Sequence, residues 1–179
     1  DRGWFELLVV AHTRTLLRRQ NLEVFAGQAR VWRLSPVDGN REVVQLADSW
    51  MGANSLVSAN NHVDAYLDRN GDDAPDDVTD ATLLKGRAHS PSQNFDFPAG
   101  EGSTGQDPRQ YPGMAVLQLF YFSNLAHDYF YALGFDEAAG NFQNDNFGKG
   151  GKGPDAMLAE AQDGRVTNNG NDGPPPDGV

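Results

Sequence analysis

The sequence contains no cysteine in its 179 residues. This absence excludes disulfide bonds, cysteine-ligated zinc and thiol nucleophiles. It does not indicate a compartment, because both secreted and intracellular proteins can lack cysteine. The chain is long enough for a real hydrophobic core in one ordinary domain, or in one domain with an appendage.

Basic residues are scarce, with 14 Lys and Arg against 25 Asp and Glu, and the formal net charge is −11. Binding to a phosphate backbone requires a basic face, so this balance disfavours nucleic acid as a partner. An excess of acids is the commonest way to keep a protein soluble. It also suits an extracellular protein that meets calcium.

Long uninterrupted apolar segments are missing as well. The richest apolar stretch, residues 114–135, is broken by Gln118, Ser123, Asn124, His127 and Asp128. A helix facing lipid would not tolerate these polar residues at mid-depth. The stretch therefore predicts a buried helix and no membrane span.

One long helix is predicted over residues 113–133. Pro112 stands where a helix begins, and Gly134 stands where a left-handed C-terminal cap would end it. The first half is apolar almost all round, which indicates burial on several sides. The second half keeps one apolar face, made of Leu125, Tyr129, Phe130 and Leu133.

The rest of the chain reads as short strands and loops. The predicted strands are residues 4–11, 15–20, 29–34, 42–46 and 62–67. Asp136 is a candidate N-cap for a helical turn at 137–139, and the glycine-rich residues 148–153 predict a loop tip. Together these segments predict an α+β fold, in which a strand-rich N-terminal portion packs around one long buried helix.

The histidines offer no local metal motif. The four are His12, His62, His89 and His127, and no two are three or four residues apart. A zinc site built from them would need distant segments to converge. For His127 we expect a structural role, as a helix histidine that hydrogen-bonds a neighbouring loop.

An acidic run at residues 68–77 is a candidate calcium loop. Oxygen-bearing side chains alternate at Asp68, Asn70 and Asp72, with a further carboxylate at Asp76. Alternation lets one turning loop direct several oxygens at a hard cation. The run departs from the EF-hand pattern, because its glycine is at the fourth position instead of the sixth. The alternative is a simple solvated acidic turn.

Several motifs together resemble one family. They are LFYFSNLAHDYFYALGFDEAAGNFQNDNFG (119–148), PDAMLAEAQDG (154–164), NNGND (168–172), PPPDG (174–178) and, before the helix, QNFDFP (93–98). This text resembles the N-terminal part of the fungalysin metallopeptidases, closely over residues 90–178 and loosely over 29–90. The resemblance implies a strand at 155–161, where helix propensity alone predicts a helix.

The resemblance implies zinc chemistry whose residues the chain lacks. Fungalysins hold zinc with two histidines of an HExxH helix and a downstream glutamate, and the glutamate of the motif acts as general base on the zinc-bound water. No HExxH occurs in these 179 residues. We therefore expect the N-terminal part of a secreted, extracellular zinc metalloendopeptidase, inactive alone. Its expected partners are a C-terminal half that carries HExxH and protein or peptide substrates.

Domain limits and substrate contacts also follow from the resemblance. Residues 1–28 resemble the tail of a propeptide, as in a zymogen, and residues 29–179 the N-terminal subdomain of the peptidase. In thermolysin-like enzymes an edge strand and the asparagines after it hold the substrate backbone. Here residues 155–161 are the candidate edge strand. The candidate substrate-binding residues are Asn168, Asn169, Gly170 and Asn171.

Two departures affect this last motif. Gly170 replaces the usual alanine, and Asp172 replaces the usual aromatic residue.

Two other function classes stay open at this point. One is a non-catalytic binding or assembly subunit that kept the fungalysin N-terminal fold, and the other is an unrelated calcium-stabilised adhesion module.

Overall fold

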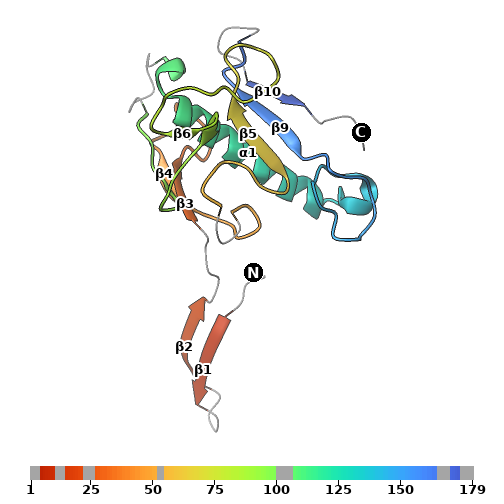
Figure 1. Cartoon of the computed structure of the whole chain (residues 1–179). Coiled ribbons are helices and arrows are strands. Elements are labelled where there is room, and N and C mark those ends of the chain that lie inside the picture. The colour runs from red at the N-terminus through yellow and green to blue at the C-terminus, as the bar shows by residue number, and fades with distance from the viewer. Residues whose placement is uncertain are drawn as a thin grey trace.

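The computed structural model describes residues 5–10, 15–21, 27–51, 55–99, 107–164 and 170–173. The fold is α+β, with small sheets arranged around one long helix and an N-terminal hairpin that projects away from them (Figure 1). The helix is α1, Pro112–Ala132, and two single turns of 3-10 helix flank it, Pro108–Gln110 and Glu137–Ala139. No helix in the described part of the chain has the length and hydropathy of a membrane span.

Ten short strands form four sheets in the described residues. The strands are β1 (Phe5–Val10), β2 (Thr15–Asn21), β3 (Gly27–Val31), β4 (Glu42–Leu46), β5 (Val63–Leu67), β6 (Leu83–Leu84), β7 (Arg87–Ala88), β8 (Asn94–Phe95), β9 (Met157–Ala161) and β10 (Gly170–Gly173). The sheet orders are β1-β2, β4-β3-β8, β6-β7 and β10-β9-β5. The five strands predicted before the helix are all present, and the antiparallel hairpin β1-β2 matches the predicted one.

Local sequence signals set both ends of α1. Pro112 occupies its first turn, as predicted. At the other end Gly134 has φ +99°, and its N–H donates to the carbonyl of Tyr131. The N–H of Phe135 donates to the carbonyl of Phe130, so the helix ends in a Schellman motif. Next along the chain, the Asp136 carboxylate accepts from the N–H of Ala139 and caps the turn that follows.

The core lies between α1 and the sheets. Phe120 and Leu117 of α1 are at most 1% exposed, and they belong to one cluster with Val63 and Ala65 of β5 and Ala159 of β9. Small residues on β9 leave room for the helix to approach the sheet. The first half of α1 is buried as its sequence predicts.

Strand β9 corrects one expectation. Residues 155–161 were predicted as the edge strand, but β9 lies in the middle of its sheet, antiparallel to β10 and parallel to β5. The physical reason is its composition, because Ala159 and Ala161 are almost fully buried and suit a central position. The outer strands of this sheet are β10 and β5.

Candidate functional site

Strand β10 places part of the predicted substrate site at a sheet edge. Gly170 pairs with Ala161 and Asn171 with Glu160, and no other described strand lies beyond β10. In an antiparallel edge strand, alternate backbone N–H and C=O groups point away from the sheet and stay free to pair. Asn168 and Asn169, also predicted to bind substrate, lie outside the described residues.

The acidic loop after β5 folds around one buried carboxylate. Asp68 is 0% exposed, and its two oxygens accept from the backbone N–H groups of Gly71 (2.8 Å), Asp72 (3.2 Å) and Asp73 (3.0 Å). A carboxylate that receives several backbone N–H groups holds a tight turn. The loop therefore has a structural use for Asp68 that needs no ion.

The other three predicted calcium ligands are also engaged within the loop. An Asp76 oxygen accepts from the N–H of Arg69 at 2.7 Å, and the Asn70 amide oxygen accepts from the N–H of Asp72 at 2.9 Å. The Asn70 amide nitrogen donates to the Asp72 carboxylate at 3.2 Å. The alternating oxygens of the sequence thus bind neighbouring groups of their own loop.

The structure brings a different set of carboxylates together. Oxygens of Asp68, Asp73 and Glu160 lie within 4.8 Å of one another, a separation at which they could share one cation. Only Asp68 was predicted. Glu160 is brought here by the parallel pairing of β5 with β9, which sets it opposite Tyr66, and the Tyr66 hydroxyl donates to it at 2.9 Å. Burial and the neighbouring Glu160 carboxylate raise the pKa of the Tyr66 phenol.

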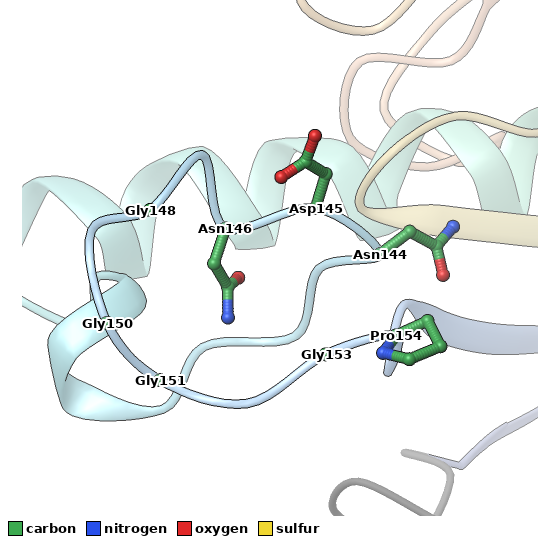
Figure 2. Close-up of a pocket in the computed structure, with 8 residues that line it drawn as sticks. All are labelled: Asn144, Asp145, Asn146, Gly148, Gly150, Gly151, Gly153 and Pro154. Carbon is green, nitrogen blue, oxygen red and sulfur yellow. The ribbon is translucent and has the colours of Figure 1, made fainter.

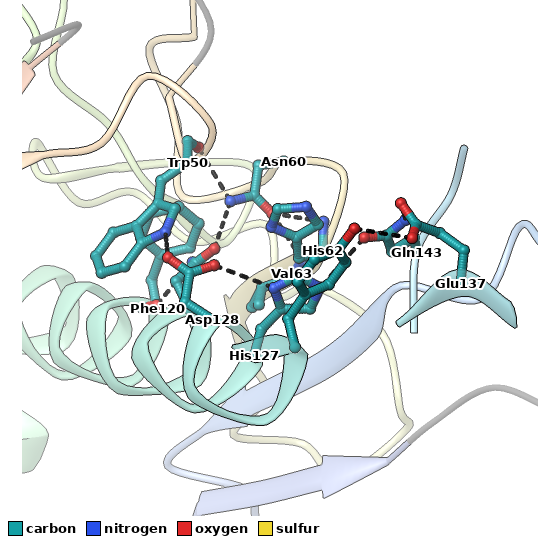
Figure 3. Close-up of polar contacts among 11 residues, drawn as sticks. Trp50, Asn60, His62, Val63, Phe120, His127, Asp128, Glu137 and Gln143 are labelled. Atoms are coloured by element: carbon teal, nitrogen blue, oxygen red, sulfur yellow. Dashed lines mark hydrogen bonds and ion pairs between the residues drawn. The ribbon is translucent and has the colours of Figure 1, made fainter. Parts of the chain in front are cut away.

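Two histidines that are distant in sequence meet beside α1. The rings of His62 and His127 stack with centroids 3.8 Å apart and planes within 8° (Figure 3). His127 contacts Asp128 through Nδ1 at 3.2 Å and the loop residue Gln143 through Nε2 at 3.3 Å. The predicted contact between His127 and a neighbouring loop is therefore present.

The electrostatics of this cluster follow from its burial. Burial, together with the nearby His127, lowers the pKa of His62 to about 4, so His62 is neutral at neutral pH. For Asp128, burial alone would raise the pKa, but hydrogen bonds from His127 and from the Trp50 indole outweigh it and lower the pKa. The carboxylate of Asp128 therefore stays ionised and anchors Trp50 to α1.

His62, His127 and Asp128 have ligand atoms within 4.8 Å of one another, yet the ring geometry does not suit a single zinc ion. Imidazole binds a metal in the plane of its ring. The lone pairs of two stacked rings 3.8 Å apart lie in nearly parallel planes, so one ion cannot lie in both ring planes close to the two nitrogens. The packed pair instead joins α1 to the segment before β5.

A glycine-rich loop follows the second 3-10 turn, as predicted. It borders a shallow hollow of about 470 Å³ that is open to solvent (Figure 2), lined by Asn144, Asp145, Asn146, Gly148, Gly150, Gly151, Gly153 and Pro154. Asp145 is the only ionisable residue of this lining, and its carboxylate accepts from the N–H of Phe147 at 2.7 Å. The lining offers no pair of groups for acid–base or nucleophilic chemistry.

A buried carboxylate fixes this loop to α1. Glu137 receives the Lys149 ammonium at 2.8 Å and the Tyr131 hydroxyl at 2.9 Å. Lys149, followed by the backbone and Tyr131, lowers the pKa of Glu137 to about 2, and Glu137 raises the pKa of Lys149. At Gly151, with φ +71°, a Cβ would lie 2.1 Å from the carbonyl oxygen of Glu137, so the loop needs glycine there.

Sequence reasoning missed Asp73, Glu160 and the contact between His62 and His127. No local signal could have found Glu160 or His62, because strand register and helix packing bring them to their partners. Asp73 lies inside the acidic run and could have been included among its candidates. Asp73 does not share the alternation of Asp68, Asn70 and Asp72.

Comparison with known proteins identifies the family that this chain matches. The model of the Fungalysin metallopeptidase (M36) family matches residues 34–179. The Extracellular metalloproteinase mep of Aspergillus flavus is 38% identical over 157 residues, which is 84% of this chain and 24% of that protein. The Extracellular metalloproteinase 3 of Trichophyton rubrum is 34% identical over 181 aligned positions, covering 98% of this chain and 28% of that protein. The chain thus spans about a quarter of the length of these relatives.

Proposed function

The chain belongs to the fungalysin metallopeptidase family, and from that premise we propose that it forms the N-terminal part of a secreted, extracellular zinc metalloendopeptidase. Its role is to build one wall of the substrate cleft and to hold an extended peptide by its backbone. Similar proteins named as extracellular metalloproteinases, in A. flavus and T. rubrum, support this proposal.

The observation that carries the proposal is the position of β10. It is one of the two outer strands of a sheet packed on α1, and it includes Gly170 and Asn171 from the motif expected to bind substrate. A peptide can pair with such an edge through its main chain, which gives affinity that depends little on side chains. Residues 168–171 are therefore the proposed substrate-binding segment.

In this proposal the residues that bind zinc lie outside the 179 residues of this chain. The sequence has no HExxH, and the parallel rings of His62 and His127 do not suit a shared metal ion. Zinc and the water that it activates would come from a C-terminal half of the same enzyme, which is the proposed partner. This chain contributes the positioning of substrate next to that half.

Two further assignments belong to the proposal. Residues 1–28 are the proposed propeptide tail, and the start of the family match at residue 34 is compatible with that limit. Calcium is proposed as a stabilising ion at Asp68, and the clustering of its oxygens with those of Asp73 and Glu160 supports this placement.

A second candidate function is a non-catalytic binding or assembly subunit with the fungalysin N-terminal fold. The departures from the family's substrate-binding motif at Gly170 and Asp172 are the observation that favours it. Membership of the family argues against an unrelated adhesion module. The two remaining functions differ in whether a zinc-binding partner restores peptide hydrolysis.

If β10 binds the substrate backbone, N-methylation should lower kcat/KM only at alternate positions of the substrate. The test uses the chain extended by the zinc-binding segment of the A. flavus relative, with substrate peptides N-methylated at one backbone position at a time. A lost hydrogen bond costs about 1 kcal/mol, so methylation at the positions that pair with β10 should lower kcat/KM about fivefold to tenfold. Methylation at the positions between them is the matched control and should have little effect. Equal effects at all positions would contradict pairing with an edge strand.

A further inference from the structure

The second half of α1, together with its C-cap residue Leu133, carries an apolar face that is largely open to solvent in this chain. Five large apolar side chains make up this face, with exposed fractions of 37% at Phe122, 38% at Leu125, 63% at Tyr129, 51% at Phe130 and 67% at Leu133. Their spacing of one, three or four residues places them on one side of the helix. Buried residues of α1, such as Phe120 and Asn124, lie on the opposite side. We call these five residues the outer face of α1.

The outer face lacks the charges of a solvated helix surface. A helix with one side in water normally presents charged residues there. In α1 the only Asp, Glu, Lys or Arg is Asp128, and its carboxylate binds Trp50 and His127. Single exposed apolar residues are common, but a contiguous group of this kind marks an interaction surface. The outer face is therefore expected to be covered in the assembled protein.

The C-terminal end of β10 lies near this part of the molecule. The last described residue of β10, Gly173, pairs with Leu158 of β9. The neighbouring Met157 donates its N–H to the carbonyl of His62, and His62 stacks on His127 in the second half of α1. The end of β10 thus lies at the same end of the sheet as the outer face of α1.

We propose that the outer face of α1 is the docking surface for the zinc-binding part of the same polypeptide. This inference rests on the proposed function. The matched part is only 24% and 28% of two relatives, so a polypeptide of their length has a large further part available to cover the face. The matching surface on that segment would be apolar, because the outer face offers five large apolar side chains and no charge to pair with.

A second copy of the chain is a weaker occupant. Each copy carries a formal charge of −11, so two copies repel each other at low salt. A segment of the same polypeptide is tethered, and tethering gives an effective concentration on the order of millimolar without new contacts. These two effects favour the intramolecular partner.

Hydroxyl-radical footprinting tests the docking directly. The 179-residue chain is compared with the chain extended by the zinc-binding segment of the A. flavus relative. Oxidation of Tyr129, Phe130 and Leu133 should fall about fivefold or more in the extended protein, because a packed interface excludes solvent. Leu34 and Val37, which are 74% and 79% exposed, are the internal controls and should react equally in both proteins. Equal oxidation of the outer face in both proteins would overturn the proposal.

Substitutions on the outer face distinguish a loss of docking from a loss of stability in the 179-residue chain itself. Tyr129→Asp combined with Leu133→Asp should lower the Tm of the extended protein and leave the Tm of the 179-residue chain nearly unchanged. Leu34→Asp combined with Val37→Asp should change neither. Protection that appears only as the concentration of the unextended chain rises would assign the face to a second copy and overturn the proposal.

Peptide hydrolysis by the extended protein distinguishes this inference from the proposed function. A protein that protects the outer face but cleaves no peptide would keep the docking surface and contradict the peptidase role. A protein that cleaves peptides while its outer face stays exposed would support the peptidase role and contradict the docking surface.

Discussion

Phe120→Ala is expected to lower the free energy of unfolding by about 3–5 kcal/mol, the usual cost of removing a buried phenylalanine. Phe120 is 1% exposed and belongs to the core between α1 and the sheet. Domains of this size are stable by about 5–15 kcal/mol, so the loss would remove a large part of the total. Urea unfolding followed by circular dichroism measures it.

Phe122→Ala is the matched control, two residues further along the same helix. Phe122 is 37% exposed and lies on the outer face, so its truncation in the 179-residue chain should cost about 1 kcal/mol or less. The side chain and the helical context are the same in both variants, and only the burial differs. Equal losses for the two variants would contradict the burial of one side of α1 and the exposure of the other.

Asp68→Ala is expected to lower the free energy of unfolding by about 2–4 kcal/mol in the presence of a chelator, because buried donors that lose an acceptor are costly. The substitution leaves the N–H groups of Gly71, Asp72 and Asp73 without the carboxylate that they bind. Asp72→Ala is the control. Its exposed carboxylate accepts only from the Asn70 amide among the hydrogen bonds of this loop, so the cost should stay within about 0.5 kcal/mol.

The same variants test the proposed calcium ion. If calcium binds Asp68, Asp73 and Glu160, added calcium should raise the Tm of the wild-type chain, and Asp73→Asn should abolish most of that rise. A wild-type Tm that does not change with calcium would contradict calcium binding. The chelator measurement on Asp68→Ala would still stand, because it depends only on hydrogen bonds within the loop.

Local signals predicted much of the fold. Pro112, Gly134 and Asp136 act on backbone groups a few residues away, so their effects are readable from sequence, and they set the limits of α1 and the following turn. Residues 42–46 were likewise predicted as a strand and form β4. At Met157–Ala161, helix propensity pointed the wrong way, because pairing with β5 and β10 outweighs local preference.

The candidate site was less predictable, because its members come from distant segments. Strand order decided that β9 is central and β10 is the edge, and no local pattern encodes that order. The register of β5 against β9 brings Glu160 to Asp68, and packing of α1 brings His127 onto His62. The apolar residues after Ser123 were recognised as one face of a helix, but their exposure became visible only in the fold.

The rate of peptide hydrolysis tests most directly whether the chain is one part of a zinc endopeptidase. The 179-residue chain, supplied with zinc, should show no turnover above background, because the sequence contains no HExxH. The chain extended by the part of the A. flavus relative that is proposed to bind zinc should cleave an unstructured protein substrate, and a chelator should abolish the cleavage. Turnover by the 179-residue chain alone, or a folded and zinc-loaded extended protein that cleaves nothing, would contradict the assignment.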